Sequence, residues 1–255
     1  EDLSHWVELL LNDGVYKNDT LLQPGLVTDL MTPRTPFRVS KRQKENGTYF
    51  RAYALGWSVF DYYGVKVAEH NGGMPGYITK VSVVPDENLG VIVLNNGFDF
   101  FTHEVILHEV LDHYLRPGKE RDWIELSQKQ RDRYTNYKEK QTESRVNSRI
   151  NGTHPSLPKA QYTGKYTDKM YGMATVTMKE GELFLTLEPA ADIFTAKMKH
   201  WHHDTYRVDF DDPFLPFGLI TFHFNSRGEV AHFMMDLPSN DFHFDNLNFR
   251  KTKSN

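Results

Sequence analysis

Residues 119–150 restrict the folding of this chain more than any other segment. They are dense in Lys, Arg, Glu and Asp, and their large apolar residues form only a thin stripe: Trp123, Leu126, Tyr134 and Tyr137. So narrow a stripe buries little, which predicts a solvated connecting helix. A linker rich in Pro and turn residues follows at 151–158. We therefore expect a domain at 1–118, a charged helical linker at 119–158 and a second domain at 159–255.

The first domain has the pattern of helices packed on an antiparallel sheet. Apolar residues at helical spacing predict a helix that ends near Asn12, and Pro24 begins a short second helix that extends through Met31. Residues 38–50 are predicted to form a surface loop. Strands are expected at 54–60, 65–68, 77–84 and 89–94, followed by a helix at 101–115. Because Val91–Leu94 is apolar on both faces, the sequence predicts a buried central strand there.

Beyond Ala160 the apolar residues alternate with polar ones, which is typical of strands. Many short strands separated by turns at regular spacing predict a barrel or a sandwich. Phe242 and Phe244 share one face, whereas Leu247 and Phe249 shift parity, so a β-bulge is expected between the two pairs. The complete prediction is an α+β chain in which a barrel follows the sheet and the charged helix.

Composition excludes several classes of function. The net charge is −4, so the chain has no basic excess with which to bind nucleic acid. It contains no Cys, which excludes disulfides, and no apolar run approaches the ~20 residues of a membrane span. His200-Trp-His-His203 lacks a second spaced cluster, so we expect no metal site and no cofactor. The spacing of His103, His108 and His113 does not stack them on one helix face.

The stretch Glu69-His-Asn-Gly-Gly-Met-Pro-Gly-Tyr77 carries the chemically informative residues. A residue that can carry positive charge, His70, precedes the small polar Asn71 and a glycine, Gly72, at the expected end of a strand. Histidine donates hydrogen bonds and titrates near neutral pH. Glycine lets a substrate backbone approach closely, because it has no Cβ. The pattern therefore predicts a substrate-binding sheet edge.

Together with Ala54-Leu-Gly-Trp-Ser58 upstream and Leu89–Asn96 downstream, this stretch resembles the third motif of penicillin-binding proteins and class C β-lactamases. The resemblance covers roughly residues 1–117. From Tyr162-Thr-Gly-Lys-Tyr166 onward, including His200–Tyr206 and Asp212-Pro213, the chain resembles the lipocalin-like β-barrel often appended to that family. The resemblance implies a partial β-lactamase-like sheet with packed helices, followed by this accessory barrel.

In that family a serine of Ser-x-x-Lys attacks an acyl group, and strand amides stabilise the oxyanion. The resemblance implies that His70 replaces the motif lysine, that Asn71 and Gly72 complete the motif and that the backbone N–H of Gly73 is an oxyanion donor. No nucleophile is expected in this chain, because the only Ser-x-x-Lys is Ser156–Lys159, in the linker. The chain alone is therefore expected to be inactive. We interpret it as a fragment of a hydrolase whose N-terminal half is missing.

Two functions remain open from sequence. In the first, the parent protein is a serine hydrolase that cleaves a peptide, an ester or a β-lactam, in the periplasm or outside the cell. In the second, the chain is a non-catalytic module that binds a ligand or the cell wall. The expected partner is a small-molecule or peptide acyl substrate, with no nucleic acid and no membrane span.

Overall fold

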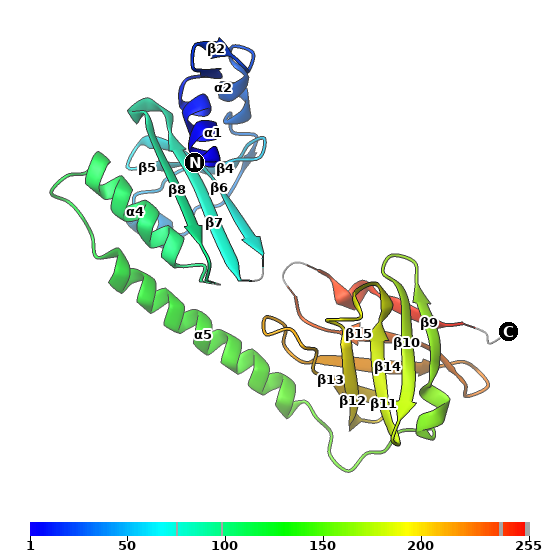
Figure 1. Ribbon diagram of the computed structural model, residues 1–255. Coiled ribbons are helices and arrows are strands. Elements are labelled where there is room, and N and C mark those ends of the chain that lie inside the picture. Colours follow the sequence, from blue (N-terminus) through cyan, green and yellow to red (C-terminus); the bar gives the residue numbers. More distant parts are fainter. Residues whose placement is uncertain (75, 98, 240–241, 253–255) are drawn as a thin grey trace. The chain divides into compact units, whose positions relative to one another are not determined.

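A computed structural model describes residues 1–74, 76–97, 99–239 and 242–252. The chain forms two compact units, residues 1–138 and 139–255. Figure 1 shows the first unit as a sheet with helices and the second as a barrel. No helix within the described ranges is both long enough and apolar enough to cross a membrane.

The first unit has its strands in one main sheet and one small hairpin. The hairpin pairs β1 (Val15–Tyr16) with β2 (Asp19–Thr20). The main sheet is antiparallel and has the order β3-β4-β5-β6-β7-β8. Its strands are β3 (Thr35–Pro36), β4 (Arg51–Tyr53), β5 (Ser58–Tyr62), β6 (Val65–Met74), β7 (Tyr77–Val84) and β8 (Leu89–Asn95). The helices are α1 (Asp2–Leu11), α2 (Leu26–Leu30), α3 (Lys41–Glu45), α4 (Thr102–Leu115) and the first part of α5 (Trp123–Asn147).

Helices cover both faces of the main sheet, so the sheet has an apolar cluster on each side. On one face, residues of α1 and α2 pack on Val59, Ala68 and Val83. On the other face, residues of α4 and Trp123 pack on Phe60 and Val67. Ala68 and Val67 are neighbours in β6, and strand alternation sends them to opposite faces. This two-sided burial explains why adjacent apolar residues occur in β5, at Val67 and Ala68 of β6, and at the end of β7.

Gly90 allows α1 to pack closely on β8. A Cβ at this position would overlap Cγ1 of Val7, which is a buried residue of α1. Gly90 has no positive φ, so the helix contact rather than the backbone conformation requires glycine here. The absence of a side chain at residue 90 therefore allows α1 to pack close to β8.

Three local predictions for the first unit were wrong. The strand run at 91–94 is not central, because β8 forms an edge of the described sheet and Leu94 is 65% exposed. The segment 38–50 is not only a loop, since it contains α3, which begins with a capping box of Ser40 and Gln43. The strand expected from Ala54 begins at Ser58 instead, because Gly56 adopts φ +81° in a turn.

The charged segment forms α5, as expected for a solvated connecting helix. Only Trp123 and Ser127 are buried along its length. Near its end, Arg145 donates to both carboxylate oxygens of Asp236 and to the carbonyls of Phe217 and Asp236. Arg149 then donates to the Trp201 carbonyl at 2.9 Å. The last turn of the helix is therefore bonded to the second unit, within which both arginines lie.

The second unit is a closed barrel with the order β10-β11-β12-β13-β14-β15-β16-β9, and its neighbouring strands pair antiparallel throughout the described residues. Closure removes the free edges that an open sheet would leave. The strands are β9 (Gly164–Asp168), β10 (Gly172–Lys179), β11 (Glu182–Leu187), β12 (Thr195–His202), β13 (Thr205–Val208), β14 (Gly218–Phe224), β15 (Val230–Asp236) and β16 (Asn248–Lys251).

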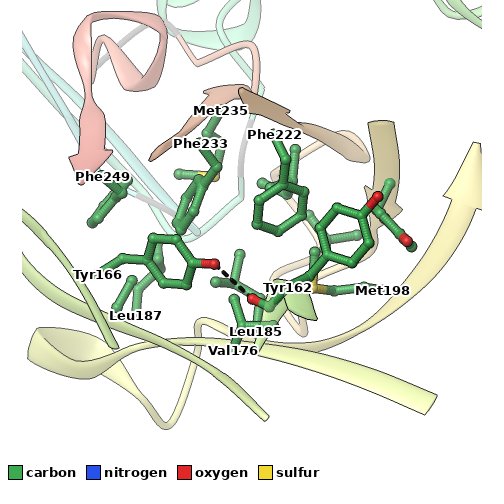
Figure 2. Close-up of a cluster of buried hydrophobic side chains, with 14 of the residues drawn as sticks. Tyr162, Tyr166, Val176, Leu185, Leu187, Met198, Phe222, Phe233, Met235 and Phe249 are labelled. Carbon is green, nitrogen blue, oxygen red and sulfur yellow. Dashed lines mark hydrogen bonds between the residues drawn. The ribbon is translucent and has the colours of Figure 1, made fainter. Parts of the chain in front are cut away.

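Large side chains fill the barrel interior (Figure 2). Tyr166, Phe233 and Phe249 are completely buried, and the Tyr166 hydroxyl donates to the Tyr162 carbonyl at 2.6 Å. The predicted bulge near Leu247 is wrong, because a 3-10 turn, η4 (Phe244–Asn246), produces the parity shift. The predicted fold class is confirmed: an α+β unit with an antiparallel sheet, a charged helix and a small β-barrel.

Candidate functional site

The predicted site residues lie at the end of β6, where one edge of the strand is open. β7 pairs with β6 from Ala68 to Met74, the end of the strand. β5 pairs with β6 only as far as Glu69, which lies opposite Ser58. Residues His70–Gly73 therefore have a strand neighbour on one side and none from β5 on the other. All four residues are exposed.

Two tight hairpins fix which backbone groups face the open edge. Tyr62 pairs with Val65 across a two-residue turn, and Met74 pairs with Tyr77. The residues that close such turns form hydrogen-bonded pairs, which then alternate along an antiparallel ladder. Along this alternation, starting from either pair, the backbone N–H and C=O of the even-numbered β6 residues point toward β7. Those of Asn71 and Gly73 therefore point to the open edge.

The His70 side chain contacts a tyrosine from β4, which lies two strands away from β6 in the sheet. Tyr53, the last residue of β4, has its hydroxyl 3.3 Å from Nε2 of His70. The two rings meet edge to face, with centroids 6.5 Å apart. Both side chains reach solvent, so the pair is available to a ligand. Tyr53 was missed from sequence because strand pairing, rather than spacing along the chain, brings it to His70.

The two motif glycines have a packing role that is visible without a substrate. A Cβ on Gly72 would overlap Oγ1 of Thr79, its partner on β7. At Gly73 the nearest atom to a built Cβ would be Cδ1 of Ile78, at 3.3 Å. The neighbouring strand therefore explains Gly72 on its own, while Gly73 is constrained less tightly.

A buried charge network supports β6 from the opposite face. Nζ of Lys80, on β7, lies 2.6 Å from Oε2 of Glu69 and 2.7 Å from Oε1 of Glu104. Lys80 is fully buried and Glu69 is nearly so. Glu69 precedes His70 in the strand, so their side chains point to opposite faces. Breaking a buried ion pair by removing one partner costs about 3–5 kcal/mol, so the network strongly favours this strand geometry.

Histidines add to this network from α4. Burial alone would raise the pKa of Glu104, but a hydrogen bond from His103 and the charge of Lys80 outweigh it and hold that pKa well below its ordinary value. His103 Nε2 lies 3.4 Å from Oε1 of Glu104, and His108 Nδ1 lies 3.9 Å from Oε2. Both histidines therefore lie close to the carboxylate of Glu104, although their five-residue spacing does not stack them on one helix face.

The single Ser-x-x-Lys match has its polar groups committed elsewhere. The Ser156 hydroxyl donates to Oδ2 of Asp204 at 2.7 Å. Nζ of Lys159 donates to Oε2 of Glu182 and to the carbonyl of Gly181. A catalytic pair needs the lysine or another base close to the serine hydroxyl, and here each is bound to a different acidic residue. Within the described residues no group of three or more His, Cys, Asp or Glu side chains is arranged to hold a metal ion.

The barrel matches a known family model. Residues 148–251 match "Domain of unknown function (DUF3471)". Among curated proteins, the chain is 24% identical over 210 residues to "Unguisins hydrolase ungD" of Aspergillus violaceofuscus, covering 72% of this chain and 35% of the relative. It is 26% identical over 141 residues to "Unguisins hydrolase ungD'" of Aspergillus campestris, covering 51% of this chain and 25% of the relative.

Solved structures give more distant likenesses. One is "the octameric penicillin-binding protein homologue from Pyrococcus abyssi", with a TM-score of 0.39 and 14% identity over 98% of this chain and 46% of that one. Another is "SurE with D-Leu", with a TM-score of 0.32 and 16% identity over 90% of this chain and 44% of that one. The chain thus spans about a quarter to a third of its curated relatives' length.

Proposed function

Because this chain is related to β-lactamase-like hydrolases and carries their DUF3471 barrel, we propose that β6 is the substrate-binding strand of a serine hydrolase. The likeness to a hydrolase covers 72% of the chain, which is more than either compact unit contains. The relatives are much longer than this chain, so the nucleophile is proposed to come from the longer protein.

The open edge of β6 is the observation that carries this proposal. Backbone N–H and C=O groups on an unpaired strand segment accept an extended ligand as an added strand. Asn71 and Gly73 offer these groups, and His70 with Tyr53 lies in the same exposed segment. A peptide-like acyl compound bound there would align its backbone with β6.

Each residue has a distinct proposed role. When a serine hydroxyl attacks the acyl carbon, the carbonyl oxygen gains negative charge, and the N–H of Gly73 would donate a hydrogen bond to it. His70 would touch the substrate and stabilise charge near the reacting group, without being the base. Tyr53 would act as a positioning residue, since its contact is with His70 Nε2. Collapse of the intermediate formed by that attack would break the bond to the amine or alcohol of the substrate and release that group, which leaves an acyl-enzyme ester. Water would then cleave the ester, release the acid and restore the serine.

The substrate class follows from strand addition. We propose an amide or an ester within a peptide-like molecule, and we place the protein in the periplasm or outside the cell. The alternative, a module that binds ligands in its barrel, is disfavoured by the interior of that barrel, which aromatic and aliphatic side chains fill. A fully packed barrel of this size leaves side chains rather than a ligand at its centre.

Covalent labelling tests the assignment of the nucleophile. This chain alone should form no adduct with a fluorescent penicillin or a fluorophosphonate, as measured by in-gel fluorescence and intact-mass spectrometry. The longer protein should be labelled by at least one of the two probes. A stoichiometric adduct on any serine of this chain would contradict the proposal, and an adduct on Ser156 would transfer the nucleophile to the linker.

A further inference from the structure

A second candidate site lies on the face of the sheet that α4 and α5 cover, opposite the face to which His70 points. A cavity of ≈ 260 Å³ opens there between α3, α4, the start of α5 and the sheet. Its walls include the aromatic residues Phe60, Phe101 and Trp123. The volume is just below the ~300 Å³ at which pockets for drug-sized ligands begin, which suits a single small metabolite.

The floor of the cavity carries two carboxylates, and two arginines, Arg42 and Arg51, also line the cavity. Glu69 and Glu104 both line the cavity, and they share the single ammonium of Lys80. Glu69 is almost completely buried, yet a carboxylate accepts more hydrogen bonds than the one that Lys80 donates. A ligand ammonium or amide N–H would satisfy the remaining acceptors of Glu69.

Positive charge lies beside it on the same wall. Arg51 lines the cavity, and its Nε and Nη2 both lie 3.3 Å from Oγ of Ser58. Ser58 is the residue directly opposite Glu69 in the sheet, so Arg51 and Glu69 flank one serine. The remaining N–H donors of this guanidinium are suited to bind a carboxylate.

An unsatisfied hydroxyl gives an independent indication of a ligand. Ser127 lines the cavity from α5 and is only 8% exposed, yet its Oγ has no hydrogen-bond partner in the described structure. Burying a hydroxyl without a partner costs about 1–3 kcal/mol, so such groups call for an explanation. A bound polar ligand would supply the missing partner.

We propose that this cavity binds a small zwitterion of the free amino acid type. Its carboxylate would bind Arg51, its ammonium would bind Glu69, and its side chain would pack on Phe101 and Trp123. Ser127 would hydrogen-bond a ligand oxygen. The site is separate from the β6 edge and does not depend on the hydrolase assignment, since it is built from the opposite face of the sheet.

Isothermal titration calorimetry of the complete chain with L-phenylalanine tests the proposal. We expect a dissociation constant below about 1 mM. Two matched analogues separate the charges: N-acetyl-L-phenylalanine lacks the ammonium, and L-phenylalaninamide lacks the carboxylate. Each should bind at least about tenfold more weakly, since each loses one charge-assisted contact. Equal binding of either analogue, or no binding of L-phenylalanine, would overturn the proposal.

Variants locate the binding. Ser127→Ala should weaken L-phenylalanine about threefold to tenfold and leave the melting temperature equal or higher, because it removes a buried unsatisfied group. Arg51→Gln should weaken binding about tenfold or more. Arg133→Gln changes an exposed arginine of α5 outside the cavity and should leave binding within about twofold. If Ser127→Ala folds normally and binds like the parent chain, the ligand lies elsewhere and the proposal is wrong.

Discussion

A role of His70 in substrate binding and a purely structural role predict different effects of the same substitution, His70→Ala. In the longer protein that carries the nucleophile, His70→Ala should lower kcat/KM by about 10²-fold, the scale of one lost electrostatic or hydrogen-bonding group. Acylation should slow but stay detectable, because the serine and its base are unchanged. Steady-state kinetics and the rate of probe labelling measure the two effects.

A structural role for His70 would produce a different pattern. His70→Ala would then lower the melting temperature and leave kcat/KM within about threefold, and this result would refute the catalytic role. His154 is exposed, so His154→Ala serves as the matched control and should change neither quantity. His70→Lys should recover part of the lost rate, because the lysine ammonium supplies a hydrogen-bond donor and a positive charge near the acyl group.

A stacked histidine pair makes the barrel sensitive to acid. His223 and His232 lie opposite each other on β14 and β15, with ring centroids 4.6 Å apart. Burial lowers the pKa of His232, and the charges of His223 and Arg250 lower it further. In the unfolded chain this histidine titrates near its ordinary value of ~6.5. Below that pH the unfolded state binds more protons than the folded state, so stability falls as the pH falls.

Thermal unfolding measures this effect. Between pH 7.5 and pH 5.5 the barrel should lose melting temperature, and His232→Gln should reduce the loss by about 2–5 °C. His154→Gln alters an exposed histidine and should leave the loss unchanged. An equal loss in all three proteins would show that other groups govern the acid sensitivity.

The residues of the β6 site were predicted unevenly. His70–Gly73 could be predicted because their motif is continuous in the sequence. Their environment, by contrast, depends on strand pairing. Tyr53 lies 17 residues before His70, and nothing in the local pattern joins them before the strands pair. Lys80 lies within the strand predicted at 77–84, and the sequence shows neither its burial nor the two carboxylates that share its ammonium. Whether His70–Gly73 bind substrate remains a prediction.

Among the elements, α1 and β8 give a direct test of close packing. Gly90→Ala adds a Cβ that overlaps Val7, so it should lower the free energy of unfolding of the first unit by about 1–3 kcal/mol. In the double variant, Val7→Ala removes the methyl group that the new Cβ would overlap. Gly90→Ala should therefore cost less free energy of unfolding in the Val7→Ala background than in the parent chain. Denaturant unfolding followed by circular dichroism measures all four proteins. Simple additivity of the two substitutions would contradict direct contact.

The position of β8 shows that an apolar sequence pattern predicts a strand but not its place in the sheet. Its run of apolar residues predicted a strand covered on both faces, and Val91 and Val93 are indeed buried under α4. Burial of faces, however, says nothing about neighbours in the hydrogen-bonding direction. Strand existence was thus predictable from composition, whereas strand order depends on pairings between distant residues. The same reason explains why the sequence predicted a barrel but not that β9 and β16 are the strands that close it.

At the scale of the whole molecule, we predict that the chain separates into a domain at 1–118, a charged linker at 119–158 and a domain at 159–255. Most of α5 buries little, so few contacts oppose cleavage there. Limited proteolysis with trypsin, followed by mass spectrometry, should cut within 119–158 and leave a stable piece from about Ala160 onward. Cleavage spread evenly through 160–250 would contradict this division.

Arg145, near the end of α5, and Arg149, just beyond it, bear on how such a barrel is transferred between proteins during evolution. Arg145 and Arg149 bond to backbone carbonyls and to a carboxylate of the barrel, although Arg145 precedes the segment that matches the family model. A recombination event that joined the barrel to a new partner at residue 148 would leave Arg145 behind and expose Asp236 unpaired. The heritable unit is therefore longer than the recognisable one: it includes the last turns of the helix, and successful fusions should be joined upstream of Arg145.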